Sequence, residues 1–131
     1  MQGQYDFFKM KLKIDRADQL FSQWIRLRDK KCVRCHSPVK FAYKTDLPIS
    51  HQASHFYGRA RENTRFEPDN VDTLCMGCHR SWGSDDREAY RAFKLKQLGA
   101  ERFNSLMIQA NLYHKKDRKF EVIKWREALK T

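Results

Sequence analysis

Four cysteines in two closely spaced pairs are the clearest chemical signal in the sequence. Cys32 and Cys35 form one Cys-x-x-Cys pair, Cys75 and Cys78 form another, and the chain contains four cysteines in all. Each pair can present two thiolates to one ion from a tight turn, and two pairs supply the four soft ligands of tetrahedral zinc. The alternatives are disulfides or redox pairs, which a reducing cytoplasm disfavours. We therefore expect a structural Zn²⁺.

The segment between the two pairs carries the residue types that phosphodiester hydrolysis needs. A histidine can take a proton from water near neutral pH, and a metal ion can stabilise charge on the phosphate and the departing oxygen. Arginines in a loop between these groups can contact DNA phosphates. The candidates are His51, His55, Arg59, Arg61, Arg65, Asn70 and, directly after the last cysteine, His79.

Each of these residues also has a structural interpretation. His55 could be a buried core histidine, and His79 could be a surface residue or a zinc ligand. Asn70 follows Pro68-Asp69, which is a good turn sequence, so it could simply be a turn residue. The arginines could form a solvated basic loop. A strand through His55 facing a short helix that the zinc site fixes would instead bring His55 and His79 together.

Several stretches of the chain resemble a known family of nucleases. The order His55, Asn70, His79 is similar to the HNH, or ββα-metal, motif in its zinc-ribbon form. Residues 21–35 (FSQWIRLRDKKCVRC), 52–59 (QASHFYGR), 64–79 (TRFEPDNVDTLCMGCH) and 90–99 (YRAFKLKQLG) resemble phage NinG/Rap-type recombination nucleases. The similarity covers roughly residues 15–110.

The resemblance implies a metal-dependent DNA endonuclease that cuts or nicks DNA, with branched recombination intermediates as a further expectation. In that family the first histidine is the general base, the asparagine positions the strand and loop, and the last histidine holds the catalytic metal. These roles fall on His55, Asn70 and His79. The products would be 5′-phosphate and 3′-hydroxyl ends, and the catalytic ion would be Mg²⁺, Mn²⁺, Ni²⁺ or Zn²⁺.

Two positions depart from the pattern of many HNH enzymes. Ser54 stands directly before the base, where an Asp or His often supplies a second metal ligand, and Gly83 stands where a second helix histidine could lie. His51, Asn70 or a backbone carbonyl are candidates for that ligand. An ion with few protein ligands would bind weakly and need DNA phosphate to complete its shell.

Hydrophobic periodicity predicts the elements around this site. Apolar spacing indicates an amphipathic helix over about 16–30, with Asp15 as N-cap. Strands are expected at 39–43, 49–56 and 71–74, with a loop over 57–69. Ser84 and Asp85 can cap a helix that ends at Gly99, a second helix follows, and Asp117 can open a last one. We expect one α+β domain over 1–131, with a small ββα-metal core and a four-cysteine zinc ribbon over about 32–83, flanked by an N-terminal helix and by C-terminal helices over about 85–130.

The charge of the chain points to a polyanionic partner. Lys and Arg total 27 against 16 Asp and Glu, a formal net charge of +11. Neutralising phosphates releases condensed counterions, which drives association with DNA; solubility alone is the alternative. We expect DNA as partner and no membrane. The first 19 residues lack the apolar stretch of a secretion signal, so a cytoplasmic location in a bacterial host or phage-infected cell is expected. Monomer and homodimer both stay open.

Two other function classes fit parts of the sequence. A non-catalytic zinc-ribbon DNA-binding module explains the charge and the cysteines but not the spacing of the histidines and asparagine. A zinc-stapled protein-interaction adaptor predicts binding that is insensitive to salt, whereas DNA binding weakens steeply as salt rises.

Overall fold

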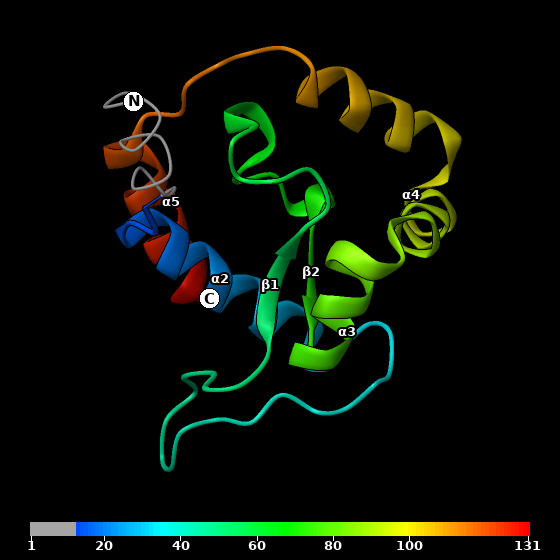
Figure 1. Cartoon of the computed structure of the whole chain (residues 1–131). Helices are drawn as coiled ribbons and strands as arrows, with labels where there is room; N and C mark the ends of the chain where they lie inside the picture. Colours follow the sequence, from blue (N-terminus) through cyan, green and yellow to red (C-terminus); the bar gives the residue numbers. More distant parts are fainter. Residues whose placement is uncertain (1–12) are drawn as a thin grey trace, which may run out of the picture.

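A two-stranded antiparallel sheet separates two groups of helices. The computed structural model describes residues 13–131, and the first twelve residues, which include part of the stretch tested for a secretion signal, lie outside it. Strand β1 (Gln52–His55) pairs with β2 (Val71–Leu74), and His55 stands opposite Val71. Helices α2 (Arg16–Asp29) and α5 (Arg118–Leu129) lie on one side of the sheet, and α4 (Arg87–Ala110) lies on the other (Figure 1). The expected mixture of helices and strands is confirmed.

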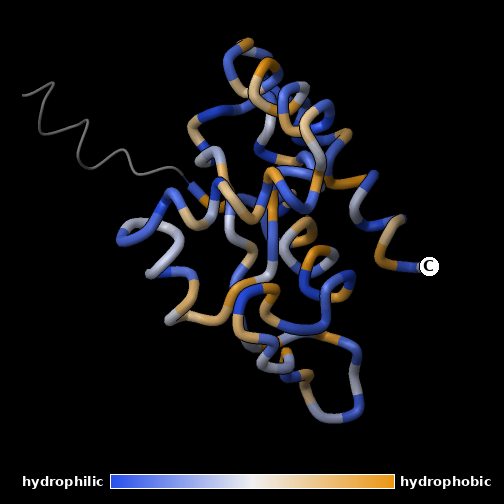
Figure 2. The backbone as a smooth tube through the Cα atoms, turned by 90° about the vertical axis from the view of Figure 1, so that its right-hand side faces the viewer, coloured by the Kyte–Doolittle hydropathy of each residue, from blue (hydrophilic) through white to orange (hydrophobic). Residues whose placement is uncertain are grey.

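Strand alternation gives each face of the sheet its own hydrophobic core. The face toward α2 buries Ala53 and Val71 with Phe21, Ile25 and Trp125. The opposite face buries a second cluster, which consists of Cys32, Phe56, Leu74, Cys78, Trp82, Tyr90, Leu98, Phe103 and Leu106. The helix traces alternate between hydrophilic and hydrophobic turns (Figure 2), as helices with one buried side do.

Helix α2 begins where local capping predicts. Asp15 accepts from the backbone N–H of Asp18, and the Asp18 carboxylate accepts from the backbone N–H of Asp15, which completes a capping box. The helix ends at Lys30, whose φ of 61° breaks the helical path. Helix α5 is capped by Asp117, as expected.

A short helix follows the second cysteine pair and leads into α4. Helix α3 (Met76–Arg80) continues into a wider π-helical turn, η3 (Ser81–Asp85). Because this turn takes up Ser84 and Asp85, the expected cap there is wrong, and Asp86 caps α4 instead. Gly99 has a φ of 82° and interrupts α4, so it divides two helical segments at the predicted position.

Two of the expected strands differ from the structure. Residues 39–43 form no regular strand and make one isolated bridge, between Phe41 and Pro48. The strand expected over 49–56 is confined to β1. Loop 57–69 is irregular as predicted, and it contains the 3-10 turn η1 (Glu62–Thr64) and the start of η2 (Pro68–Asn70). Pro38 and Pro48 lack the backbone N–H that a continuous ladder needs.

A buried charge pair fastens α4 to the sheet. Lys94 Nζ lies 3.0 Å from Asp72 Oδ2, and both side chains are shielded from solvent. Tyr90 donates from its hydroxyl to the same carboxylate at 2.9 Å and to the backbone oxygen of Ser54 at 3.1 Å. Gln97 donates to Asp72 Oδ1 at 3.0 Å. The carboxylate is thereby fully partnered, as burial of a charge requires.

Candidate active site and zinc site

The four cysteines form one cluster whose dimensions suit zinc. Their sulfur atoms all lie within 4.8 Å of one another, and all four thiols are free. The Cys35 and Cys75 sulfurs are 3.7 Å apart. A tetrahedron with Zn–S bonds of about 2.3 Å has edges of about 3.8 Å. The residues therefore fit a tetrahedral zinc ion, and the expectation of a metal-holding cysteine cluster is supported.

Local hydrogen bonds shape the two halves of the zinc site. Cys32 accepts at its carbonyl from the His36 N–H at 2.8 Å, which folds the first pair into a tight turn. The second pair spans the end of β2 and the start of α3. Arg34 donates to the Cys78 sulfur at 3.3 Å. Burial raises the pKa of the Cys78 thiol to about 12, whereas hydrogen bonds from Ser37 lower the pKa of exposed Cys35 to about 6.

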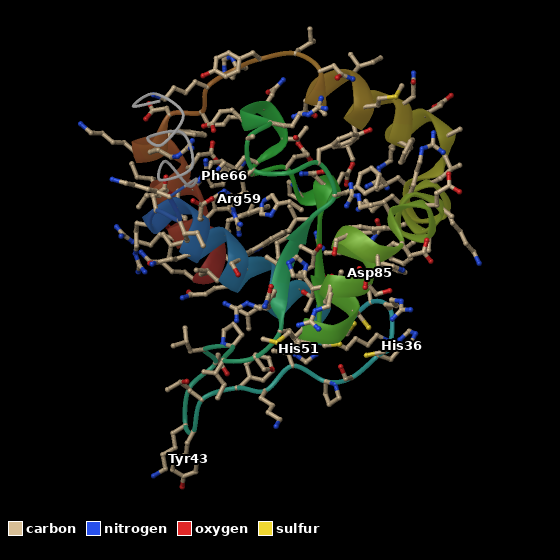
Figure 3. The ribbon with its side chains drawn as sticks, in the orientation of Figure 1. His36, Tyr43, His51, Arg59, Phe66 and Asp85 are labelled. Atoms are coloured by element: carbon tan, nitrogen blue, oxygen red, sulfur yellow. The ribbon has the colours of Figure 1, made fainter. Side chains whose placement is uncertain are left out.

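A cleft beside this cluster collects most of the predicted site residues. It has a volume of about 600 Å³ and opens between β1, α2, α3 and the loop after β1. Four of the candidates line it together: His51, His55, Arg59 and His79. Figure 3 shows His51 near the start of β1 and Arg59 beyond its end. The structure thus brings the two principal histidines to a shared space, as the sequence predicted.

His55 is held in a defined tautomer. Its Nε2 lies 2.8 Å from the carbonyl oxygen of Arg65. A carbonyl only accepts, so Nε2 carries the proton and Nδ1 keeps its lone pair. Burial, followed by the nearby charge of Arg59, lowers the pKa of His55 to about 4. The ring is therefore neutral near pH 7, and Nδ1 can accept a proton.

His79 is fixed by the same helix start that carries the cysteines. Its backbone N–H donates to the Cys75 carbonyl at 2.8 Å, so the turn that holds Cys75 and Cys78 also fixes the backbone of His79. Its Nδ1 is buried and meets no hydrogen-bonding group of residues 13–131. Burial and the charge of Arg59 lower the pKa of His79. A neutral imidazole with an unengaged nitrogen is the form that binds a divalent ion.

Asn70 stabilises the loop between the two strands through hydrogen bonds to its backbone. Its amide donates to the carbonyls of Tyr57 at 2.9 Å and Thr64 at 3.0 Å, and its Oδ1 accepts from the Tyr57 N–H at 2.8 Å. The side chain is completely buried. Asn70 therefore positions the chain on either side of His55, and it does not reach the cleft as a metal ligand.

His51 lines the cleft with both ring nitrogens already engaged. Nε2 lies 3.0 Å from both the hydroxyl and the carbonyl of Ser37, and Nδ1 lies 3.0 Å from the Ser50 hydroxyl. The carbonyl contact requires a proton on Nε2, and Nδ1 then accepts from Ser50. In this arrangement His51 has no lone pair left for a metal, unlike the sequence-based suggestion that it is a second ligand.

The three predicted DNA-contacting arginines have different surroundings. Arg59 lines the cleft and is half-buried, and its Nε lies 3.9 Å from the nearest Asp18 oxygen. Arg61 turns away and donates to Asn111 at 2.8 Å. Arg65 is buried and donates two hydrogen bonds, of 2.9 and 2.6 Å, to the Asp18 carboxylate. The expectation that Arg65 faces DNA is therefore wrong, because its guanidinium compensates a buried carboxylate.

Sequence reasoning missed Asp18 and Arg26 as parts of the site. Asp18 sets the charge beside Arg59, and Arg26 lines the cleft. Asp18 could have been suspected from the Asp15-x-x-Asp18 capping pattern, which places a carboxylate in the first turn of a helix. In residues 13–131, the cysteine cluster is the sole group of three or more His, Cys, Asp or Glu side chains with ligand atoms close enough to share an ion. Within that range His79 therefore lacks a histidine or carboxylate cluster around it.

Comparison with known proteins defines the family. The family model described as bacteriophage lambda NinG protein matches residues 7–131. The match covers almost the whole chain, so the protein belongs to the NinG family. No curated protein and no solved structure matches it. Within residues 13–131, no helix has the length and apolar character to cross a membrane.

Proposed function

We propose that this NinG-family protein is a metal-dependent DNA endonuclease of the HNH type. The observation that carries the proposal is the shared cleft, where a neutral His55 and an unengaged His79 nitrogen lie next to a zinc-fitting cysteine cluster. The resemblance to phage recombination nucleases and the family membership support recombining DNA as its substrate.

His55 would act as the general base. Its Nδ1 takes a proton from a water molecule, and the water oxygen attacks the phosphorus of the scissile phosphodiester. The bond from phosphorus to the 3′ oxygen breaks, and that oxygen takes up a proton from solvent. The hydrogen bond from Nε2 to the Arg65 carbonyl orients the ring and stabilises the imidazolium while it exists.

His79 would hold a divalent ion, which stabilises the charge on the phosphate and the leaving oxygen when bound. His51 has no lone pair left and His55 serves as the base, so among the described residues of the cleft His79 is the histidine left for the ion. The protein thus supplies few ligands, and the affinity for the ion should rise when DNA is present. Arg59 would bind a phosphate oxygen, since it lines the cleft and the nearby Asp18 carboxylate is already bound by Arg65.

The test is nicking of supercoiled plasmid by the zinc-loaded protein with added Mg²⁺, Mn²⁺, Ni²⁺ or Zn²⁺. We expect conversion to open circles, a loss of at least about 100-fold in His55→Ala, and full activity in His114→Ala, a matched change of an exposed histidine outside the cleft. Circular dichroism should show that both variants are folded. Equal activity of His55→Ala and the wild type would contradict the proposal.

A non-catalytic zinc-ribbon DNA-binding module is the second candidate. The scarcity of ligands around His79 among the described residues favours it, because a weakly held ion is a poor basis for catalysis. This candidate predicts salt-sensitive DNA binding with no cleavage under any metal, and no effect of His55→Ala on the affinity for DNA. An adaptor for proteins would show neither cleavage nor salt-sensitive DNA binding.

A further inference from the structure

A narrow hairpin projects from the body next to the zinc site. Residues 38–50, here called the finger, connect the first cysteine pair to the approach to β1 and project beyond the end of the sheet (Figure 1), with Phe41, Thr45 and Asp46 across a cleft from α2 and the end of α5. Ala42 donates to the Leu47 carbonyl and Ile49 donates to the Lys40 carbonyl, both at 2.9 Å. Lys44 turns the chain with a φ of 57°. Figure 3 places Tyr43 at the tip, far from His51 and Arg59.

The base of the finger is attached to the wall of the cleft. Arg26 donates to the carbonyls of Pro48 at 3.3 Å and Ser50 at 3.2 Å. The His51 ring bonds to Ser37 and Ser50 at 3.0 Å, on the two sides of the base. Arg26 and His51 both line the cleft. A ligand held by the finger would therefore keep a defined position relative to His55 and His79.

The finger exposes apolar side chains beside cations. Tyr43 is 86% exposed, and Leu47 and Ile49 are exposed as well. The Lys44 ammonium lies 5.4 Å from the centre of the Tyr43 ring. The finger itself carries Lys40 and Lys44 against Asp46, and Lys30, Lys31 and Arg34 precede it in the chain. A partner that offers both flat apolar faces and negative charge complements this surface, and single-stranded nucleic acid has both.

We propose that the finger binds DNA next to the cleft, with Tyr43 stacked on an unpaired base and Lys40 and Lys44 near phosphates. The inference rests on the proposed function in that the cleft receives DNA. An extended chain rises about 3.3 Å per residue, so the seven steps from Tyr43 to Ser50, the first of which lie in the turn at the tip, span roughly 20 Å. At about 3.4 Å per nucleotide, the stacked base lies on the order of six nucleotides from the phosphate in the cleft. Tyr43 is then a specificity residue for DNA with unpaired bases.

Fluorescence anisotropy separates this role from cleavage. The zinc-loaded protein carries His55→Ala and receives no added catalytic metal, so the DNA stays intact. One probe is a duplex with a six-nucleotide single-stranded gap, and the other is the same duplex fully paired. Tyr43→Ala should weaken binding to the gapped duplex about 10-fold, whereas Tyr43→Phe should bind it like the parent. Binding to the paired duplex should change less than about twofold.

Tyr113→Ala is the matched control, because Tyr113 is 80% exposed and lies outside the finger. It should leave both affinities unchanged. A 2-aminopurine placed in the gap should be quenched by the parent and not by Tyr43→Ala. Equal affinities of Tyr43→Ala and Tyr113→Ala for the gapped duplex would overturn the inference. So would a Tyr43-dependent dimer in sedimentation, which would make the finger a contact between copies. If plasmid nicking fails while the Tyr43 effect remains, the nuclease proposal falls and the finger keeps its role.

Discussion

At the scale of single residues, the chemistry depends on which nitrogen of each histidine is free. Three histidines line the cleft, yet their environments separate their roles. His51 uses both ring nitrogens for Ser37 and Ser50, His55 uses Nε2 for a carbonyl, and His79 leaves Nδ1 unengaged within the described part of the chain. These hydrogen bonds support a structural role for His51, and they support the proposed roles of His55 as base and His79 as metal ligand.

The pH dependence of cleavage should reflect the environment of His55. Its pKa is lowered from an ordinary 6.5 to about 4, so the ring loses its proton at lower pH than an exposed histidine does. The base form therefore stays populated as the pH falls below 6.5, and it disappears as the pH passes through about 4. We expect single-turnover rates at saturating metal to hold between pH 7 and about 5.5. A rate that falls tenfold per pH unit below 6.5 would show that the base is an ordinary, solvated histidine.

The same lowered pKa affects stability in a defined direction. Below pH 6.5 the unfolded chain binds a proton at this histidine that the folded protein resists down to about pH 4. The free energy of unfolding therefore falls as the pH drops through this window. Urea titrations should show less of this decrease in His55→Ala than in the wild type.

At the scale of elements, the sheet has only two strands among the described residues, and different contacts hold the helices on its two faces. Both faces use apolar packing, and the α4 face adds the buried group of Lys94, Asp72, Tyr90 and Gln97. Because Asp72 lies opposite Ser54 in the register, this group also fixes the strand that carries His55.

Breaking the buried pair should destabilise the protein strongly. Lys94→Met leaves the Asp72 carboxylate buried without its cation, and loss of one partner of a buried pair costs about 3–5 kcal/mol of unfolding free energy. Arg102→Met is the control, because it removes an ion pair with Asp69 whose arginine is well exposed. Urea unfolding should show a large shift for the first variant and almost none for the second. Equal shifts would mean that the buried group does not hold α4 in place.

Elements with local signals could be predicted from the sequence, and those that depend on distant contacts could not. Asp15, Gly99 and Asp117 act within their own helix ends, and each marks the boundary expected of it. The burial of Arg65 depends on Asp18, 47 positions away, which no local pattern reveals. The apolar alternation over 39–43 predicts a strand, yet those side chains lie on the finger, with no sheet to pack against among the described residues.

At the scale of the whole molecule, the zinc site ties the finger, the sheet and α3 together. One cysteine pair precedes the finger, and the other connects β2 to α3, so one ion would join segments that lie some forty residues apart. The core is small, and a metal staple adds stability that burial alone supplies only modestly.

Removing zinc should therefore unfold the protein. We expect one bound zinc per chain by metal analysis, and a cooperative loss of helical circular dichroism when a strong chelator removes it. Cys78→Ser should behave like the chelated protein, since this buried sulfur has no replacement in the cluster. An unchanged melting temperature after complete zinc removal would refute the stabilising role.

The proposed function requires His55 and His79 to act on one phosphate in a common cleft. The most direct measurement is anomalous diffraction from a crystal of the zinc-loaded protein, bound to DNA and soaked in Mn²⁺. We expect a manganese signal at a ring nitrogen of His79, with a DNA phosphate oxygen bound to the same ion on the side that faces His55. Manganese found elsewhere, with the phosphate backbone remote from both rings, would contradict it.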